Sequence, residues 1–297
     1  MPRSRSQSSE AARRRRMAAA RVRRADFLAE NGVLEHAITH YEKAAELDGH
    51  NADTRVKLGD AYFEAEMPRK AYQAYRKALK IHPRHAEAHF CLGEFYYTIG
   101  RIRAAAQTME KALACDPTRH WYACRLGDVH WLIGNIEKAR GHYERAVELA
   151  PGEGYYHYKL AEFHMRTREF EAAVPAYECA VRCAPVDDFY AARLGAAYAR
   201  NKQLEQARAV LVRATMLAPE SPVYRYALAD IMLLQANDEA AERLVESTGP
   251  LDEYHTDGLR RWRIRAGLGP LSDIGLLPAS EMDDLDPAED ERRLEAD

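Results

Sequence analysis

A 34-residue pattern that recurs about seven times constrains the fold of this chain more than any other feature. Three columns of identical residues keep this spacing through most of the 297 residues. The first two columns are alanine and the third is proline: Ala37, Ala71, Ala105, Ala139, Ala173, Ala207 and Ala241; Ala44, Ala78, Ala112, Ala146, Ala180 and Ala214; Pro83, Pro117, Pro151, Pro185 and Pro219. A period of this length predicts an array of stacked units.

Within one period, Ala52–His85, the spacing of small and apolar residues predicts two helices. Leu58, Gly59 and Tyr62 fall on one face of the first helix, and Ala71, Tyr75 and Ala78 fall on one face of the second. Small residues allow two backbones to approach, and proline just beyond a helix ends it. Each unit is therefore expected to be a helical hairpin that buries its remaining apolar surface against its neighbours.

These residues resemble the tetratricopeptide repeat family. The Leu-Gly-x-x-Tyr run at Leu58 recurs at Leu92 and Leu194 and, with histidine in the last place, at Leu126; the usual early tryptophan is missing. The resemblance implies an all-α, right-handed α-solenoid of about seven helix-turn-helix hairpins with an inner groove. It names no ligand.

The repeat defines four expected segments. Residues 1–17 form an Arg-rich, disordered basic leader, and residues 18–248 form the superhelix, with units that begin at Ala18, Ala52, Ala86, His120, Gly154, Asp188 and Pro222. Residues 249–268 form a C-terminal capping helix, and residues 269–297 form a disordered acidic tail. Gly32, Gly100 and Gly134 are expected in tight turns between helices, and Pro175 is expected to bend the helix that contains it.

The charge is unevenly distributed although the net charge is only −3. Residues 1–24 hold nine arginines and one glutamate, whereas residues 281–297 hold nine acids and two arginines. The run Arg13–Arg16 is interpreted as a solubilising leader, as an arm for nucleic acid or an anionic surface, or as a targeting or docking segment. Arg260–Arg265 is similarly either the charged face of a cap or a basic-aromatic contact.

In the family, the ninth place of each first helix faces the groove. Here it holds Asp26, Asp60, Glu94, Asp128, Glu162, Ala196 and Asp230, six acids in seven. Carboxylates beside aromatic rings favour a ligand that carries arginine or lysine together with apolar groups. The expected partner-binding residues are Phe90, Glu94, Tyr97, Trp121, Asp128, Trp131, Tyr155, Tyr158 and Glu162.

A structural interpretation of the same residues stays open. Arg23, Lys57, Arg125 and Lys159 stand three residues before an acid, so the acids can be explained by ion pairs within a helix. Some aromatic side chains can likewise be explained as wedges between neighbouring first helices. The absence of asparagine at the ninth place argues against the carboxylate clamp that some family members use for chaperone tails.

The sequence favours a non-enzymatic protein-interaction scaffold that binds a peptide or helix of a partner protein. We expect no cofactor, metal site or catalytic residue, because His36 and His40, and Cys179 and Cys183, are isolated pairs without further ligands. Five scattered cysteines favour reduced thiols and a cytoplasmic location. No apolar run reaches the ~20 residues of a membrane span. Self-association through the basic leader and association with nucleic acid are the alternatives.

Overall fold

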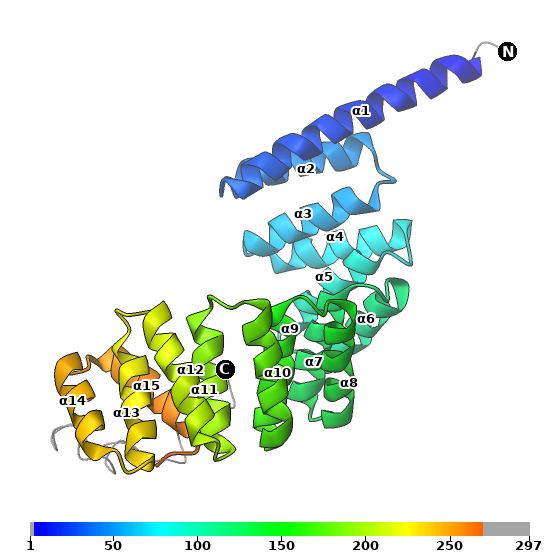
Figure 1. Cartoon of the computed structure of the whole chain (residues 1–297). Helices are drawn as coiled ribbons and strands as arrows, with labels where there is room; N and C mark the ends of the chain where they lie inside the picture. The colour runs from blue at the N-terminus through cyan, green and yellow to red at the C-terminus, as the bar shows by residue number, and fades with distance from the viewer. Residues whose placement is uncertain (1–2, 270–297) are drawn as a thin grey trace. The chain divides into compact units, whose positions relative to one another are not determined.

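The computed structural model describes residues 3–269, with side chains from Ser9 onward. These residues form fifteen helices and no strand (Figure 1). The helices are α1 Arg3–Glu30, α2 Leu34–Leu47, α3 Ala52–Glu64, α4 Pro68–Ile81, α5 Ala86–Thr98, α6 Ile102–Cys115, α7 His120–Ile133, α8 Ile136–Leu149, α9 Gly154–Arg166, α10 Phe170–Cys183, α11 Asp188–Arg200, α12 Leu204–Leu217, α13 Pro222–Leu234, α14 Asp238–Thr248 and α15 Glu253–Ala266.

The helices belong to two compact units, residues 1–149 with α1–α8 and residues 150–297 with α9–α15. Within each unit an odd-numbered helix pairs with the next even-numbered one, so α3 and α4, or α9 and α10, form one hairpin. We call the odd-numbered members up to α13 the first helices and the even-numbered ones the second helices. Six first helices, from α3 to α13, begin at the residues that the 34-residue period predicted, which confirms the all-α repeat fold.

The two alanine columns lie in the core of the hairpins. Every alanine from Ala37 to Ala241 in the first column, and from Ala44 to Ala214 in the second, has no exposed surface. A larger side chain at these places would push paired helices apart. The 34-residue period of alanines therefore reflects the close approach of the two helices in every hairpin.

The glycine of the Leu-Gly run lets a side chain of the second helix lie against the backbone of the first. A Cβ on Gly59 would stand 2.4 Å from the ring of Tyr75, and one on Gly127 would stand 2.9 Å from the ring of Tyr143. These distances are shorter than ordinary contacts. The missing Cβ thus makes room for a large residue on the partner helix.

A residue with a left-handed backbone conformation (positive φ) connects the two helices of each hairpin. Gly32, Gly100 and Gly134 have φ of +74°, +74° and +82°, which confirms the predicted turns. The equivalent places in the other four hairpins are occupied by non-glycine residues with φ between +56° and +61°: Glu66, Arg168, Lys202 and Ala236. The turn geometry is thus kept even where the sequence lacks glycine.

Residues 3–17 differ from the expectation of a disordered leader, because they belong to α1. The stretch holds six arginines and two alanines, which favour helix, and neither glycine nor proline interrupts it before Gly32. From Ser9 onward, Ala18 is the first side chain of α1 that is buried. Residues 270–297, which include most of the predicted acidic tail, lie outside the described residues.

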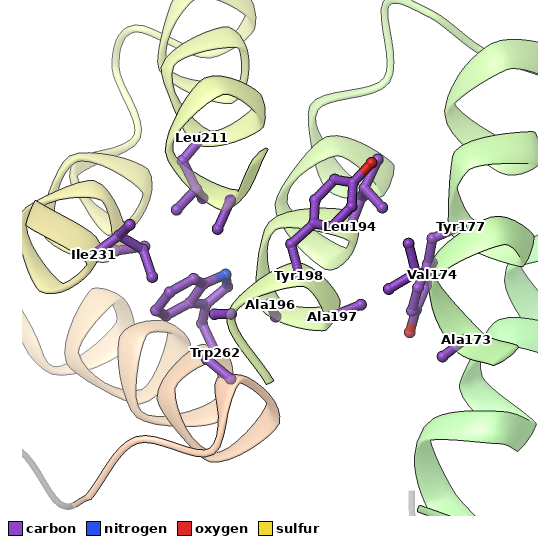
Figure 2. Packing of buried hydrophobic residues seen from close by; sticks show 14 of the residues in the cluster. Ala173, Val174, Tyr177, Leu194, Ala196, Ala197, Tyr198, Leu211, Ile231 and Trp262 are labelled. Carbon is purple, nitrogen blue, oxygen red and sulfur yellow. The ribbon is translucent and has the colours of Figure 1, made fainter. Parts of the chain in front are cut away.

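Pro175 lies inside α10, and the bend expected there stays a prediction. The capping helix is present as α15, and it begins after Gly249, where α14 ends. Leu259, Trp262 and Ala266 of α15 are buried. They join the core of the C-terminal unit, where Figure 2 draws Trp262 together with Leu211 and Ile231.

Candidate interaction surface

The ninth places of the first helices lie on one side of the hairpins, which we call the first-helix face. Where a tyrosine stands fifteen residues later, on the second helix, its hydroxyl donates a hydrogen bond to the ninth-place acid. The bonds are Tyr41 to Asp26 (2.7 Å), Tyr75 to Asp60 (2.8 Å), Tyr143 to Asp128 (2.6 Å) and Tyr177 to Glu162. One oxygen of each of these carboxylates is therefore already engaged within its own hairpin.

A cation of the following repeat offsets several of the same acids. Lys57 bonds Asp26 at 2.9 Å and Arg193 lies 3.8 Å from Glu162, each pair 31 residues apart. The sequence indicated pairs three residues apart within one helix. For Lys57 that interpretation is wrong, because its bonds go to the preceding repeat, where the stacked first helices are neighbours.

Asp60 departs from this pattern. The position 31 residues later holds Cys91 instead of lysine or arginine, and no ion pair of Asp60 occurs among the described residues. Burial raises the pKa of Asp60 above its ordinary value, although the hydroxyl of Tyr75 opposes the shift. Among the ninth-place acids of the N-terminal unit, Asp60 is thus the one without a cation partner in the described structure.

Three of the predicted binding residues in the N-terminal unit gather around Arg125. Its guanidinium donates to both oxygens of Glu94, at 2.7 and 3.0 Å, and lies 4.1 Å from the centre of the Tyr97 ring. Its distance to Asp128 is 3.7 Å. Arg125 therefore occupies the place that we expected a ligand cation to take.

Phe90 and Trp121 wedge between neighbouring first helices, as the structural interpretation proposed. Phe90 is buried, and its ring lies 4.5 Å from Trp121 and 4.6 Å from Tyr122. Trp121 and Trp131, both on α7, are partly buried. Among the predicted aromatic residues of this unit, Phe90 thus belongs to the core, while Tyr97, Trp121 and Trp131 keep accessible surface.

In the C-terminal unit, Tyr155, Tyr158 and Glu162 lie along α9. Tyr155 is the most accessible of the nine predicted residues, with 49% of its surface exposed. Tyr158 stacks on Tyr190, with ring centres 5.5 Å apart. Burial, followed by the nearby charge of Glu162, raises the pKa of Tyr158 to about 12, so its hydroxyl stays protonated.

The first-helix face of the C-terminal unit is covered by α15, which packs on α11 and α13. Arg263 pairs with the ninth-place Asp230 at 2.5 Å, and both side chains are buried. Arg265 lies 3.4 Å from Glu162, the ninth-place acid of α9. The indole of Trp262 donates to the carbonyl oxygen of Ala192 at 3.1 Å.

This arrangement gives a reason for the one ninth place without an acid. Ala196 lies in the same buried cluster as Trp262 and Ala266, and Figure 2 draws the Trp262 ring next to α11. A carboxylate there would lie beneath apolar groups and would be costly to bury. The basic-apolar segment Arg260–Arg265 is therefore a structural part of the C-terminal unit.

The nine predicted residues are divided between the two units. Six lie in the N-terminal unit and three in the C-terminal unit. The sequence interpretation placed Arg125 beside Asp128, as observed, but it did not predict the bonds from Arg125 to Glu94 or the packing of α15 on this face. The 31-residue spacing between a cation and the preceding acid could have indicated the contact with Glu94, but no local pattern indicates where α15 packs.

Among the described residues, no group of three or more histidine, cysteine or acidic side chains gathers as a metal site would require. Within residues 3–269, no helix has the combination of length and apolar character that crossing a bilayer demands.

Comparison with known proteins agrees with the repeat architecture. The family model described as tetratricopeptide repeat matches residues 56–120 and 124–188. No curated protein matches the chain in sequence.

Solved structures share the fold at low identity. The C-terminal part of a TPR repeat-containing protein from Cytophaga hutchinsonii is 18% identical with a TM-score of 0.63, over 80% of this chain and 99% of that one. Pseudomonas aeruginosa pilF is 22% identical with a TM-score of 0.59, over 75% and 98%. Residues 56–120 and 124–188 match the tetratricopeptide repeat model, and the in-register helical hairpins of the chain share the fold of tetratricopeptide repeat proteins.

Proposed function

We propose that this chain is a non-enzymatic scaffold that binds a basic-apolar peptide or helix of a partner protein on the first-helix face of its N-terminal unit. Proteins of this repeat family generally act as scaffolds for other proteins. The finer assignment rests on one observation, the way in which α15 uses the same face of the C-terminal unit.

The α15 helix supports the proposal because its basic and aromatic side chains bind the first-helix face of the C-terminal unit in the way that a partner helix would. Its arginines reach ninth-place acids and its tryptophan fills the surface between them. Within the described residues of the N-terminal unit, no helix packs across the equivalent face of α3, α5 and α7. An amphipathic helix with arginine and an aromatic residue would bury apolar area there and gain charge-assisted hydrogen bonds.

The neighbourhood of Arg125 limits the charge that a partner can offer. Glu94 is fully engaged by Arg125 and Asp128 lies beside the same guanidinium, so a ligand cation would meet Asp60. Tyr97 and Trp131 would supply ring surface. The ligand is therefore held more by apolar and aromatic contact, and less by charge, than the stripe of acids alone suggested.

Titration of the full chain with a labelled synthetic peptide of residues 253–266 tests the proposal. We expect binding that Tyr97→Ala together with Trp131→Ala weakens about tenfold or more, because aromatic anchors carry most of such interfaces. Arg145→Ala on the exposed side of α8 is the matched control. Equal affinity of the double variant and the control variant would contradict the proposal.

A nucleic-acid or anionic-surface role remains the second candidate, because Arg13–Arg16 are all exposed on α1. It would use clustered arginines to displace counterions from phosphates. Salt-sensitive retention on heparin that disappears when the four arginines become glutamine would favour it. Retention that persists in that variant would count against it.

A further inference from the structure

The C-terminal unit contains a second concave feature, separate from the surface proposed above, between α11, α13 and α15. It is a hollow of about 330 Å³, which we call the α15 pocket. Small-molecule and side-chain pockets begin at about this size. Its walls come from one compact unit, so its shape is set by the packing of α15.

Four aromatic side chains line the α15 pocket, and two of them remain exposed after folding. Phe189 on α11 is 41% exposed, and Tyr254 on α15 is 78% exposed. Trp262 and Tyr224 contribute further ring surface, and the hydroxyl of Tyr224 is held by Asp188 at 2.6 Å. Large rings left in solvent beside a hollow offer contact area to an apolar group.

Arginine is the main charged residue of the α15 pocket, whose lining also includes Ser221 and His255. Arg193, Arg261 and Arg265 line it, and no aspartate or glutamate is among the described residues that line it. Glu162, which lies outside the lining, is shared by Arg193 and Arg265 at 3.8 and 3.4 Å. Arg261 is exposed and has no ion pair or hydrogen bond among the described residues. The pocket therefore carries an excess of positive charge beside its aromatic walls.

From this combination we infer that the α15 pocket binds an acidic peptide segment in which an apolar side chain stands next to aspartate or glutamate. The apolar side chain enters the hollow between Phe189, Tyr254 and Trp262. The neighbouring carboxylate accepts hydrogen bonds from the Arg261 guanidinium, whose donor geometry suits a carboxylate. The exposed ring of Tyr254 extends the contact beyond the hollow, as a continuing peptide chain requires.

Fluorescence anisotropy of the full chain with a labelled peptide of repeating Glu-Leu-Asp-Leu sequence tests the inference. A peptide of repeating Gln-Leu-Asn-Leu sequence is the uncharged control. We expect the acidic peptide to bind at least about tenfold more tightly than the amide peptide, and its affinity to fall with added salt. Equal binding of the two peptides, or binding of neither, would overturn the inference.

Substitutions assign the binding to the α15 pocket. Arg261→Glu is expected to lower the affinity about tenfold or more, and Tyr254→Ala by several-fold, since both side chains are exposed beside the hollow. Arg182→Glu on α10, an exposed arginine outside the pocket, is the matched control and should leave the affinity unchanged. An equal loss with Arg182→Glu would show general charge attraction and overturn the inference.

The acidic residues at positions 281–297 are the competing occupant. A full-length variant with these acids replaced by their amides should bind the acidic peptide as the parent chain does. Binding that appears only in this variant would assign the pocket to the chain's own acidic segment and would overturn a partner as its ligand. Unchanged far-UV circular dichroism is required of every variant.

Discussion

At the residue scale, the acid at the ninth position of the first helix is paired within the chain, but the residue that pairs with it differs between hairpins. The ninth-place acid is paired with a tyrosine fifteen residues later in four hairpins. Where that position holds Met109, the acid is Glu94 and bonds Arg125, and where it holds Leu211, the ninth place is Ala196. The sequence could indicate the stripe of acids, but only the stacking of hairpins reveals that most of them have partners within the chain.

The left-handed turn residues give the first prediction at this scale. Ala236 has φ of +56°, a region that costs residues with a Cβ about 1–2 kcal/mol. Ala236→Gly should therefore raise the free energy of unfolding by roughly 1 kcal/mol, allowing for the greater entropy of the unfolded glycine chain. Urea unfolding measures it. Ala209→Gly, at an exposed place inside α12, is the control and should destabilise by about the same amount.

A pair of stacked histidines in the fourth hairpin gives a prediction about pH. The rings of His130 and His142 are nearly parallel, with centres 5.2 Å apart, and they face Glu110, Lys138 and Asn135. Burial, then the charge of His130, lowers the pKa of His142 from 6.5 to about 4. The unfolded chain therefore binds more protons between these values, so this contribution is complete above pH 6.5 and is lost as the pH falls toward 4.

The test compares urea midpoints at pH 7.5 and pH 5 for the parent chain and for His142→Phe. The parent should lose stability at pH 5, and the variant should lose less, because phenylalanine keeps the stacking ring but binds no proton. An identical loss in both proteins would contradict the assignment.

At the element scale, the sequence predicted the thirteen helices α2–α14 well because their limits follow from the period, from helix-ending prolines and from glycine turns. The period did not predict the start of α1 or the packing position of α15. The helix α1 begins at Arg3 because the residues of the leader favour helix, whereas their high charge had suggested disorder. The closing helix was predicted, but its place on α11 and α13 depends on contacts with residues 33 to 103 positions away.

The buried pair of Asp230 and Arg263 should decide whether α15 stays attached. Burial raises the pKa of Asp230 to about 6, and Arg263 only partly opposes this shift. Arg263→Met would leave the carboxylate buried without its cation, at a cost of about 3–5 kcal/mol. We expect α15 amides to lose protection in hydrogen exchange in this variant.

The double variant Asp230→Leu with Arg263→Met is the matched control for that prediction. It replaces both charged partners with apolar groups and should recover most of the lost protection, since a buried ion pair can be exchanged for apolar contact at little cost. Protection that stays low in the double variant would mean that the single substitution acts through lost packing volume instead of an uncompensated charge.

At the scale of the whole chain, stability depends on neighbouring hairpins, because each has apolar surface on both sides. The two compact units contain the same repeated contacts: alanines without exposed surface, left-handed turns 34 residues apart, and cation-to-acid pairs 31 residues apart. All three spacings are preserved when one complete period is removed. They are destroyed when half a period is removed, because a second helix then meets a surface shaped for a first helix.

Deletion of residues 86–119 should therefore leave a folded and shorter array. The deletion joins His85 to His120 and brings Arg125 to the position of Cys91, 31 residues after Asp60 in the new chain. Asp60 should then gain the cation that it lacks, and its pKa should fall. We expect unchanged helicity per residue in circular dichroism and a cooperative urea transition at a lower midpoint, since one interface between hairpins is lost.

Deletion of residues 86–102, half a period, should reduce both helicity and cooperativity. Equal behaviour of the two deletions would show that register between hairpins does not determine the fold.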